Sequence, residues 1–159
     1  MAEIRLSHSY NPADQFKEIS LAEDTVAAIQ AAQAKNKYFA RYLWEAFADW
    51  DWMVLPEGVP PYEASKVGGD FAAIKLMSSH MHSMLKDVWR NKDIKPARRE
   101  NAFIKTLEAL DATEAEILIA IKDKKLDLKY PKITRDVVNA AFPTLLVMPE
   151  GAVVKASIE

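Results

Sequence analysis

Apolar side chains recur at intervals of three and four residues through most of this 159-residue chain. Between residues 71 and 89, for example, the apolar stripe consists of Phe71, Ile74, Met77, Met81, Met84, Leu85 and Val88. This spacing places side chains on one face of an α-helix, whereas a half-buried strand requires alternation. The chain also contains only four glycines, too few for many tight hairpins. The sequence therefore predicts an all-α fold.

The composition is that of one ordinary globular domain. Half of the residues are apolar, which provides enough material for a hydrophobic core at this length. The formal net charge of −2 argues against a globally basic nucleic-acid-binding protein. Because cysteine is absent, disulfides, zinc–thiolate sites and cysteine nucleophiles are excluded. With no apolar run of about 18 residues and no signal-peptide pattern at the N-terminus, we expect a soluble protein without membrane contact.

The expected domain is a compact bundle of five to six helices at residues 20–143. It is flanked by an N-terminal arm at residues 1–19 and a C-terminal tail at residues 144–159. Ser20 and Glu23 form a capping box that predicts a first helix reaching about residue 35. The remaining helices are expected at residues 36–50, 71–89, from Pro96 to about residue 110, from an Asp111 or Thr113 cap to about residue 125, and from a Thr134 cap to Phe142.

A Pro- and Gly-rich segment at residues 51–70 separates two of these helices and predicts a long loop. Loops of about twenty residues are uncommon in small domains and are often functional. Large aromatic side chains flank its prolines, so the segment is either a contact surface or a cover over the core. The candidate interaction residues are Trp50, Trp52, Pro60, Pro61 and Tyr62.

Basic side chains concentrate in residues 86–135, where 13 basic and 9 acidic residues give a local charge of +4. The preceding and following segments sum to −4 and −2. Two basic clusters in the middle segment would form a phosphate-binding face if they met in space. The candidate nucleic-acid contacts are Lys86, Arg90, Lys92, Lys95, Arg98 and Arg99 in one cluster, and Lys122, Lys124, Lys125 and Lys129 in the other.

The sequence contains no pattern typical of catalysis, metal binding or cofactor binding. His80 and His82 lie two residues apart, on different faces of a helix, so they cannot share a metal from one face. His80 is expected to be a half-buried packing residue. Asp49, Asp51 and Asp70 flank the loop, and helix capping is their more common use. We expect no catalytic, metal or cofactor site, and the alternative is a hydrolase that uses these aspartates or His80.

Two blocks of the sequence resemble a known family. One is WMVLPEGVPPY at residues 52–62, and the other runs from Arg98 to Pro143 with motifs such as RRE at residues 98–100 and KDKKL at residues 122–126. Together they resemble a family of uncharacterised small proteins of tailed, T4-like bacteriophages from marine and soil hosts. The resemblance implies a phage origin and synthesis in the host cytoplasm, and it implies no enzymatic activity or cofactor.

The expected function is therefore that of a non-enzymatic phage protein that binds a phage or host protein, in the host cytoplasm or in the virion. One alternative is a nucleic-acid-binding accessory protein that uses residues 86–135. The other is an uncharacterised hydrolase. The sequence names neither the partner nor the oligomeric state.

Overall fold

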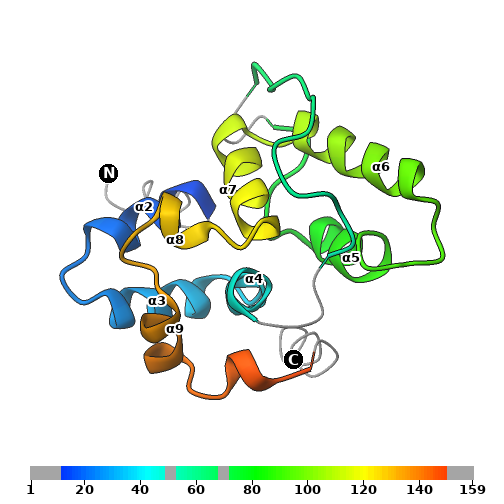
Figure 1. Cartoon of the computed structure of the whole chain (residues 1–159). Helices are drawn as coiled ribbons and strands as arrows, with labels where there is room; N and C mark the ends of the chain where they lie inside the picture. The colour runs from blue at the N-terminus through cyan, green and yellow to red at the C-terminus, as the bar shows by residue number, and fades with distance from the viewer. Residues whose placement is uncertain (1–11, 49–52, 68–71, 150–159) are drawn as a thin grey trace.

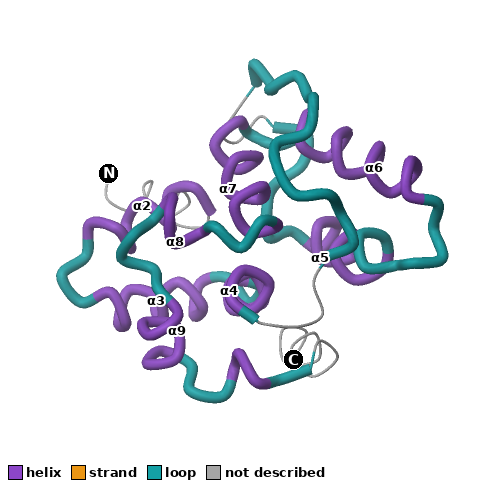
Figure 2. The backbone as a smooth tube through the Cα atoms, viewed as in Figure 1, coloured by secondary structure: helices purple, strands orange, loops and turns teal. Residues whose placement is uncertain are grey.

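The computed structural model describes residues 12–48, 53–67 and 72–149. Within these ranges the chain forms eight α-helices and no strand, which confirms the all-α prediction (Figures 1 and 2). The helices are α2 (Pro12–Leu21), α3 (Thr25–Lys35), α4 (Phe39–Phe47), α5 (Ser79–Asp87), α6 (Pro96–Ala109), α7 (Ala112–Lys122), α8 (Leu126–Lys129) and α9 (Arg135–Ala141), followed by a short 3-10 helix, η2, at Leu145–Val147.

Three helix starts are those that the sequence predicts. Pro96 occupies the first turn of α6, where its missing N–H costs no hydrogen bond. The carboxylate of Asp111 accepts a hydrogen bond from the backbone N–H of Thr113, and it rather than Thr113 caps α7. The hydroxyl of Thr134 accepts from the N–H of Val137 and caps α9. Each start is specified within its own first turn.

The prediction of an N-terminal arm at residues 1–19 is wrong for residues 12–19, because these residues belong to α2. Phe16 and Ile19 are buried on the inner face of this helix. The predicted capping box is also wrong, because Ser20 lies in the last turn of α2 and its hydroxyl donates to the carbonyl of Phe16. Asp24 caps α3 instead, through a hydrogen bond of 3.0 Å from the N–H of Ala27.

The helix expected at residues 71–89 is shorter than predicted and covers only Ser79–Asp87. Before it, Leu76 and Met77 are buried in an irregular segment, and Met77 has a positive φ of 63°. The carboxylate of Glu114 accepts from the N–H of Leu76 at 2.8 Å, and the hydroxyl of Tyr42 accepts from the N–H of Met77 at 3.2 Å. These side chains replace the partners that a helix would supply, so the apolar spacing here reflects a buried turn.

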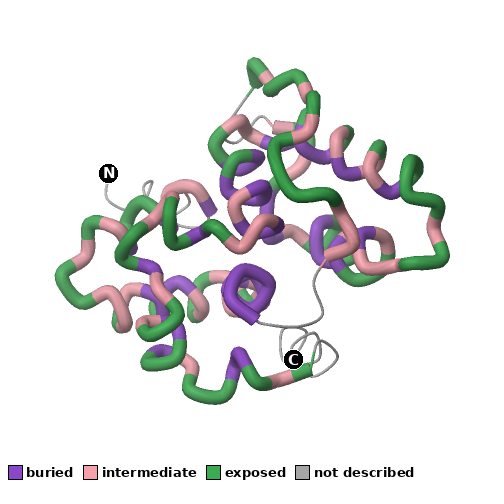
Figure 3. Tube along the Cα trace, viewed as in Figure 1, coloured by how far each residue is buried: buried purple, intermediate pink, exposed green. Residues whose placement is uncertain are grey.

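Helix α4, which is rich in aromatic residues, is at the centre of the core. Eight of its nine residues are buried, and Figure 3 shows an almost continuous buried segment there. It packs against α3, α7 and η2. Helix α7 contacts α2, α6 and α8 as well as α4, so the apolar run at residues 117–121 is buried on several sides. The segments between these helices determine the position of the candidate site.

Two elements lie outside the expected five to six helices: α2 and the one-turn helix α8. The tail expected from residue 144 begins with η2, in which Leu145 and Leu146 are buried. In the loop expected at residues 51–70, the described residues 53–67 form no helix or strand, as predicted. No helix in the described part of the chain is long and apolar enough to cross a membrane.

Candidate functional site

The Pro-rich loop folds back onto α6 and is fixed there at its beginning. The N–H of Val54 donates to the carbonyl of Trp89 at 2.8 Å. The guanidinium of Arg99 lies buried beneath this point, and its Nε donates to the carbonyl of Val54 at 2.6 Å. Its Nη1 donates to the carbonyls of Asn91 and Ile94 at 3.1 and 2.7 Å. One arginine of α6 therefore holds together the loop and the segment that precedes the helix.

A second cation fixes the middle of the loop. Lys122, at the end of α7, donates from its ammonium group to the carbonyls of Pro56 and Gly58 at 2.7 and 3.1 Å. The carboxylate of Asp123 pairs with the same ammonium and also accepts from the N–H of Gly58 at 3.1 Å. Gly58 has a φ of +100°, a conformation that glycine adopts without strain. The loop is thus bonded to α7 through both its carbonyl and its amide groups.

This anchored loop and α6 enclose a pocket of about 180 Å³. Its walls are mainly apolar: Leu55, Pro56, Pro60 and Pro61 come from the loop, and Phe103 and Ile104 from α6. Three charged residues also line the pocket: Glu57, Glu100 and Lys122. A small apolar concavity with a few polar groups is the usual form of a ligand or side-chain binding site.

Two of the five predicted interaction residues, Pro60 and Pro61, line this pocket. Tyr62 does not; it is half-buried and packs against the core, where burial first and the Glu116 carboxylate second raise the pKa of its hydroxyl. Trp50 and Trp52 lie outside the described residues. The structure thus joins the prolines to a site and assigns Tyr62 to the covering of the core.

Sequence reasoning missed the α6 side of the pocket. Phe103 and Ile104 are both apolar and adjacent in α6, and adjacent helical residues point about 100° apart. Phe103 is buried, whereas Ile104 is only half-buried and faces the pocket. The sequence shows that the two side chains point in different directions. Only the position of the loop shows that Ile104 faces a pocket.

Four of the ten candidate nucleic-acid contacts are held in contacts within the protein. Arg99 and Lys122 anchor the loop as described, Arg90 pairs with Glu45, and Lys124 donates to the backbone carbonyl of Glu45. Lys125 and Lys129 form exposed ion pairs with Glu57 and Glu116 at 3.2 and 3.1 Å, and Lys86 lies 4.0 Å from Asp87. Lys92, Lys95 and Arg98, the three remaining cations, are exposed and have no such pair among residues 12–48, 53–67 and 72–149. Of the ten candidates, Arg90, Arg99, Lys122 and Lys124 are therefore engaged within the protein, and the phosphate-binding face stays a prediction.

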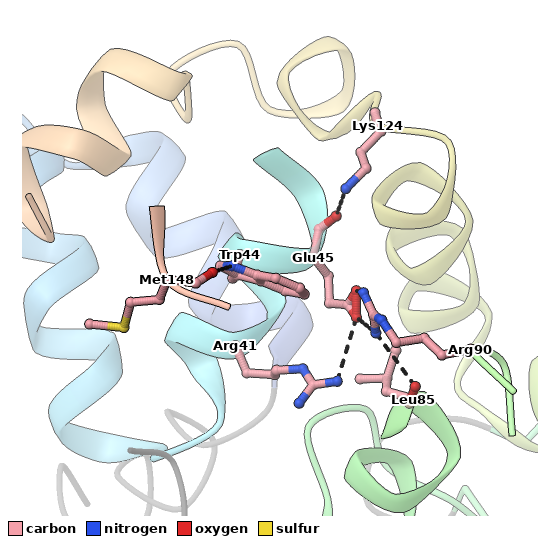
Figure 4. Close-up of polar contacts among 7 residues, drawn as sticks. All are labelled: Arg41, Trp44, Glu45, Leu85, Arg90, Lys124 and Met148. Carbon is pink, nitrogen blue, oxygen red and sulfur yellow. Dashed lines mark hydrogen bonds and ion pairs between the residues drawn. The ribbon is translucent and has the colours of Figure 1, made fainter. Parts of the chain in front are cut away.

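Glu45 is the centre of a buried ionic cluster (Figure 4). Its carboxylate binds the guanidinium of Arg90 and lies 3.6 Å from that of Arg41. Next to this pair, the guanidinium of Arg90 lies 5.1 Å from the ring centre of Trp44, whose indole N–H donates to the carbonyl of Met148 at 2.9 Å. Together with Lys124, these contacts join α4 to the segments that follow α5, α7 and η2. The cluster connects elements that are far apart in the sequence.

Of the candidate acid–base residues, the structure describes only His80. Asp49, Asp51 and Asp70 lie outside the described residues. The expectation for His80 is wrong, because it is exposed at the start of α5. His82 is buried instead, with its ring centre 4.8 Å from that of Tyr38, and burial followed by the charge of Arg41 lowers its pKa. Among the described residues, no three His, Asp or Glu side chains are placed to hold a metal ion.

The chain belongs to a family of unknown function, DUF6433, whose model matches residues 17–128. The matched range includes the described part of the loop together with α6 and α7, and thus every residue of the pocket. No curated protein matches the chain, and no solved structure does.

Proposed function

We propose that this protein is a non-enzymatic binding protein and that the pocket between the Pro-rich loop and α6 receives an apolar side chain of another protein. The observation that carries this proposal is the anchoring of the loop by Arg99 and Lys122. Because the loop is anchored, the walls of the pocket are already formed in the unbound protein.

The anchoring matters because ordering a flexible loop on binding reduces affinity. Here the backbone of the loop is already bonded to two helices, so binding requires little additional ordering. A dry apolar cavity of about 150 Å³ accommodates benzene. The pocket, at about 180 Å³, therefore fits one aromatic ring or one branched aliphatic side chain.

The rim of the pocket supports contact with a protein. Val59, in the middle of the loop, is 73% exposed, and Pro61, two residues further on, is exposed as well. In protein interfaces a central pocket is typically surrounded by contacts that exclude water, and Val59 and Pro61 are placed to make such contacts. Packing against the core explains the half-buried Tyr62, whereas Val59 at this rim is exposed.

The resemblance of residues 52–62 and 98–143 to proteins of tailed bacteriophages supports a phage or host protein as the partner. We include in the proposal that the protein acts in the host cytoplasm or in the virion, and that residues 20–143 form one domain together with α2.

Site-specific photo-crosslinking tests the proposal. A benzophenone amino acid replaces Val59 at the rim of the pocket, and in a control it replaces Leu128 on α8, which is 74% exposed. Both proteins are expressed in infected cells and irradiated. We expect a discrete crosslinked protein from position 59 and none, or a different set, from position 128. Identical products from both positions, or no protein product from position 59, would contradict the proposal.

A further inference from the structure

The outer face of α6 carries a row of positive charges that point away from the pocket. Lys95, Arg98 and Lys105 are exposed there, together with the amide of Asn101. With Ala97 and Ala102 they surround a shallow hollow of about 520 Å³ that has no carboxylate in its lining. The pocket residues Phe103 and Ile104 belong to the other side of the same helix. The two surfaces are therefore distinct.

The spacing of these residues produces a slanting band. Positions 95, 98, 101 and 105 differ by three or four, so each is a neighbour of the next on the surface of the helix. At 1.5 Å of rise per residue, the row from Lys95 to Lys105 is about 15 Å long. One strand of duplex DNA carries a phosphate about every 3.4 Å along the helix axis, so this length corresponds to about four phosphates.

Within the described part of the chain, the charges in this row are not paired. The described structure gives Lys95, Arg98 and Lys105 no ion pair and no side-chain hydrogen bond, whereas Arg99 directly beside Arg98 donates to three backbone carbonyls. Small side chains at positions 97 and 102 leave room between the cations. Asn101 adds a neutral donor of the kind that commonly contacts phosphate.

Carboxylates limit the row at its ends. Asp93 is exposed before α6, and Glu108, exposed near its end, accepts a hydrogen bond from the N–H of Glu63. The positive surface is therefore local, and the whole chain has a net charge of −2. Binding at this surface must be of modest strength and sensitive to salt.

We propose that this face of α6 binds the phosphate backbone of a nucleic acid, without sequence preference. The proposal does not depend on the apolar pocket, and either can fail without the other. Three cationic contacts predict that log K falls with log salt concentration with a slope near −2.7 for duplex DNA and near −2 for a single strand. Phosphate contacts position a protein and carry no sequence information, so different sequences should bind equally.

Fluorescence anisotropy with labelled 20-nucleotide DNA, the corresponding duplex and an RNA of the same sequence tests this at 50 mM salt. The test variant is K95E/R98E/K105E, and K95Q/R98Q/K105Q removes the charges with less perturbation. The matched control is K17E/K35E/K66E, which changes three exposed lysines elsewhere and gives the same net charge as the first variant. Circular dichroism and Tm confirm that all of them fold.

We expect the α6 variants to lose at least tenfold in affinity and the control to lose less than threefold. The three nucleic acids identify the preferred strand type. The proposal is overturned if the wild type does not bind at 50 mM salt, or if both charge-reversed variants lose affinity equally. Binding of a polyglutamate peptide as tightly as DNA would also overturn it, in favour of an acidic protein partner.

Discussion

Arg90 and Glu45 form a buried ion pair that joins the segment after α5 to the middle of α4 (Figure 4). Their side chains are 8% and 1% exposed. Removing one partner of a buried pair leaves the other charge uncompensated in a poorly solvated site, which costs about 3 kcal/mol or more. Arg41 lies 3.6 Å from the same carboxylate and still compensates Glu45 in part, so we expect Arg90→Met to lower the free energy of unfolding by no more than about 3 kcal/mol, as measured by urea denaturation.

A double-mutant cycle with Glu45→Gln isolates the interaction from other effects of the substitution. We expect a coupling energy above about 1 kcal/mol for this pair. Lys129 and Glu116 are the matched control, because their atoms lie 3.1 Å apart but both side chains are substantially exposed. Exposed pairs typically couple by about 0.5 kcal/mol or less. Equal coupling in the two cycles would show that burial of the Arg90 pair has no energetic consequence.

The anchoring of the loop by Lys122 gives a second prediction. Lys122→Met removes the ammonium group that holds the carbonyls of Pro56 and Gly58. Charge-assisted hydrogen bonds contribute about 1.5–3 kcal/mol. We expect amide hydrogen exchange in residues 53–61 to accelerate by about tenfold or more, measured by mass spectrometry.

Lys125→Met is the control for that experiment, because Lys125 contacts the same loop only through an exposed ion pair with Glu57. It should change exchange in the loop by less than about threefold, since exposed pairs contribute little. If both variants accelerate exchange equally, Lys122 has no special anchoring role.

Glu114 makes stability depend on pH. Burial raises the pKa of its carboxyl from 4.5 to about 7, although the hydrogen bond from Leu76 opposes the shift. The folded protein therefore binds this proton more tightly than the unfolded chain. The resulting stabilisation is complete below about pH 4.5 and is lost as the pH rises through about 7. At 1.36 kcal/mol per pKa unit the loss is about 3 kcal/mol.

The substitution Glu114→Gln mimics the protonated carboxyl and retains an oxygen that accepts from Leu76. We expect the difference in unfolding free energy between this variant and the wild type to move in favour of the variant by about 3 kcal/mol between pH 4.5 and pH 8. Taking the difference cancels the contributions of other titrating groups. Glu18→Gln, at an exposed position of α2, is the control for the substitution itself. A difference for Glu114→Gln that does not change with pH would refute this explanation of its carboxyl.

The start of α3 distinguishes two capping assignments. The sequence favours Ser20 with Glu23, whereas the structure assigns the cap to Asp24. Loss of a capping side chain costs about 1 kcal/mol. Asp24→Ala should therefore lower the free energy of unfolding by about that amount and Glu23→Ala by less than about 0.5 kcal/mol. The reverse order would restore the capping box.

The sequence allowed prediction of those features that are encoded locally. Pro96, Asp111 and Thr134 act within the first turn of their own helices, and all three starts are confirmed. The buried turn before α5 was not predictable in this way. Its backbone is satisfied by Tyr42 and Glu114, which lie 35 and 38 residues from their partners.

In the candidate site, too, local features were predictable from the sequence and long-range contacts were not. Pro60 and Pro61 were identifiable from the loop alone, but the opposite wall of the pocket depends on Lys122 reaching back 66 residues to Pro56. The availability of the cations is likewise not predictable from the sequence. Arg98 and Arg99 are indistinguishable in sequence, yet one is exposed and the other is buried against carbonyl groups. Clustering along the chain shows where cations are, and only the fold shows which remain available.

The most direct test of the pocket as a docking site is the yield of crosslinking from position 59 in an Ile104→Glu background. Ile104 is half-buried at the pocket wall, so the substitution is compatible with folding, which Tm verifies. An unpaired carboxylate facing an inserted apolar side chain costs several kcal/mol, and about 1.4 kcal/mol is sufficient for a tenfold change. We expect the yield of the captured protein to fall at least tenfold, and an undiminished yield of the same protein would show that the pocket does not receive it.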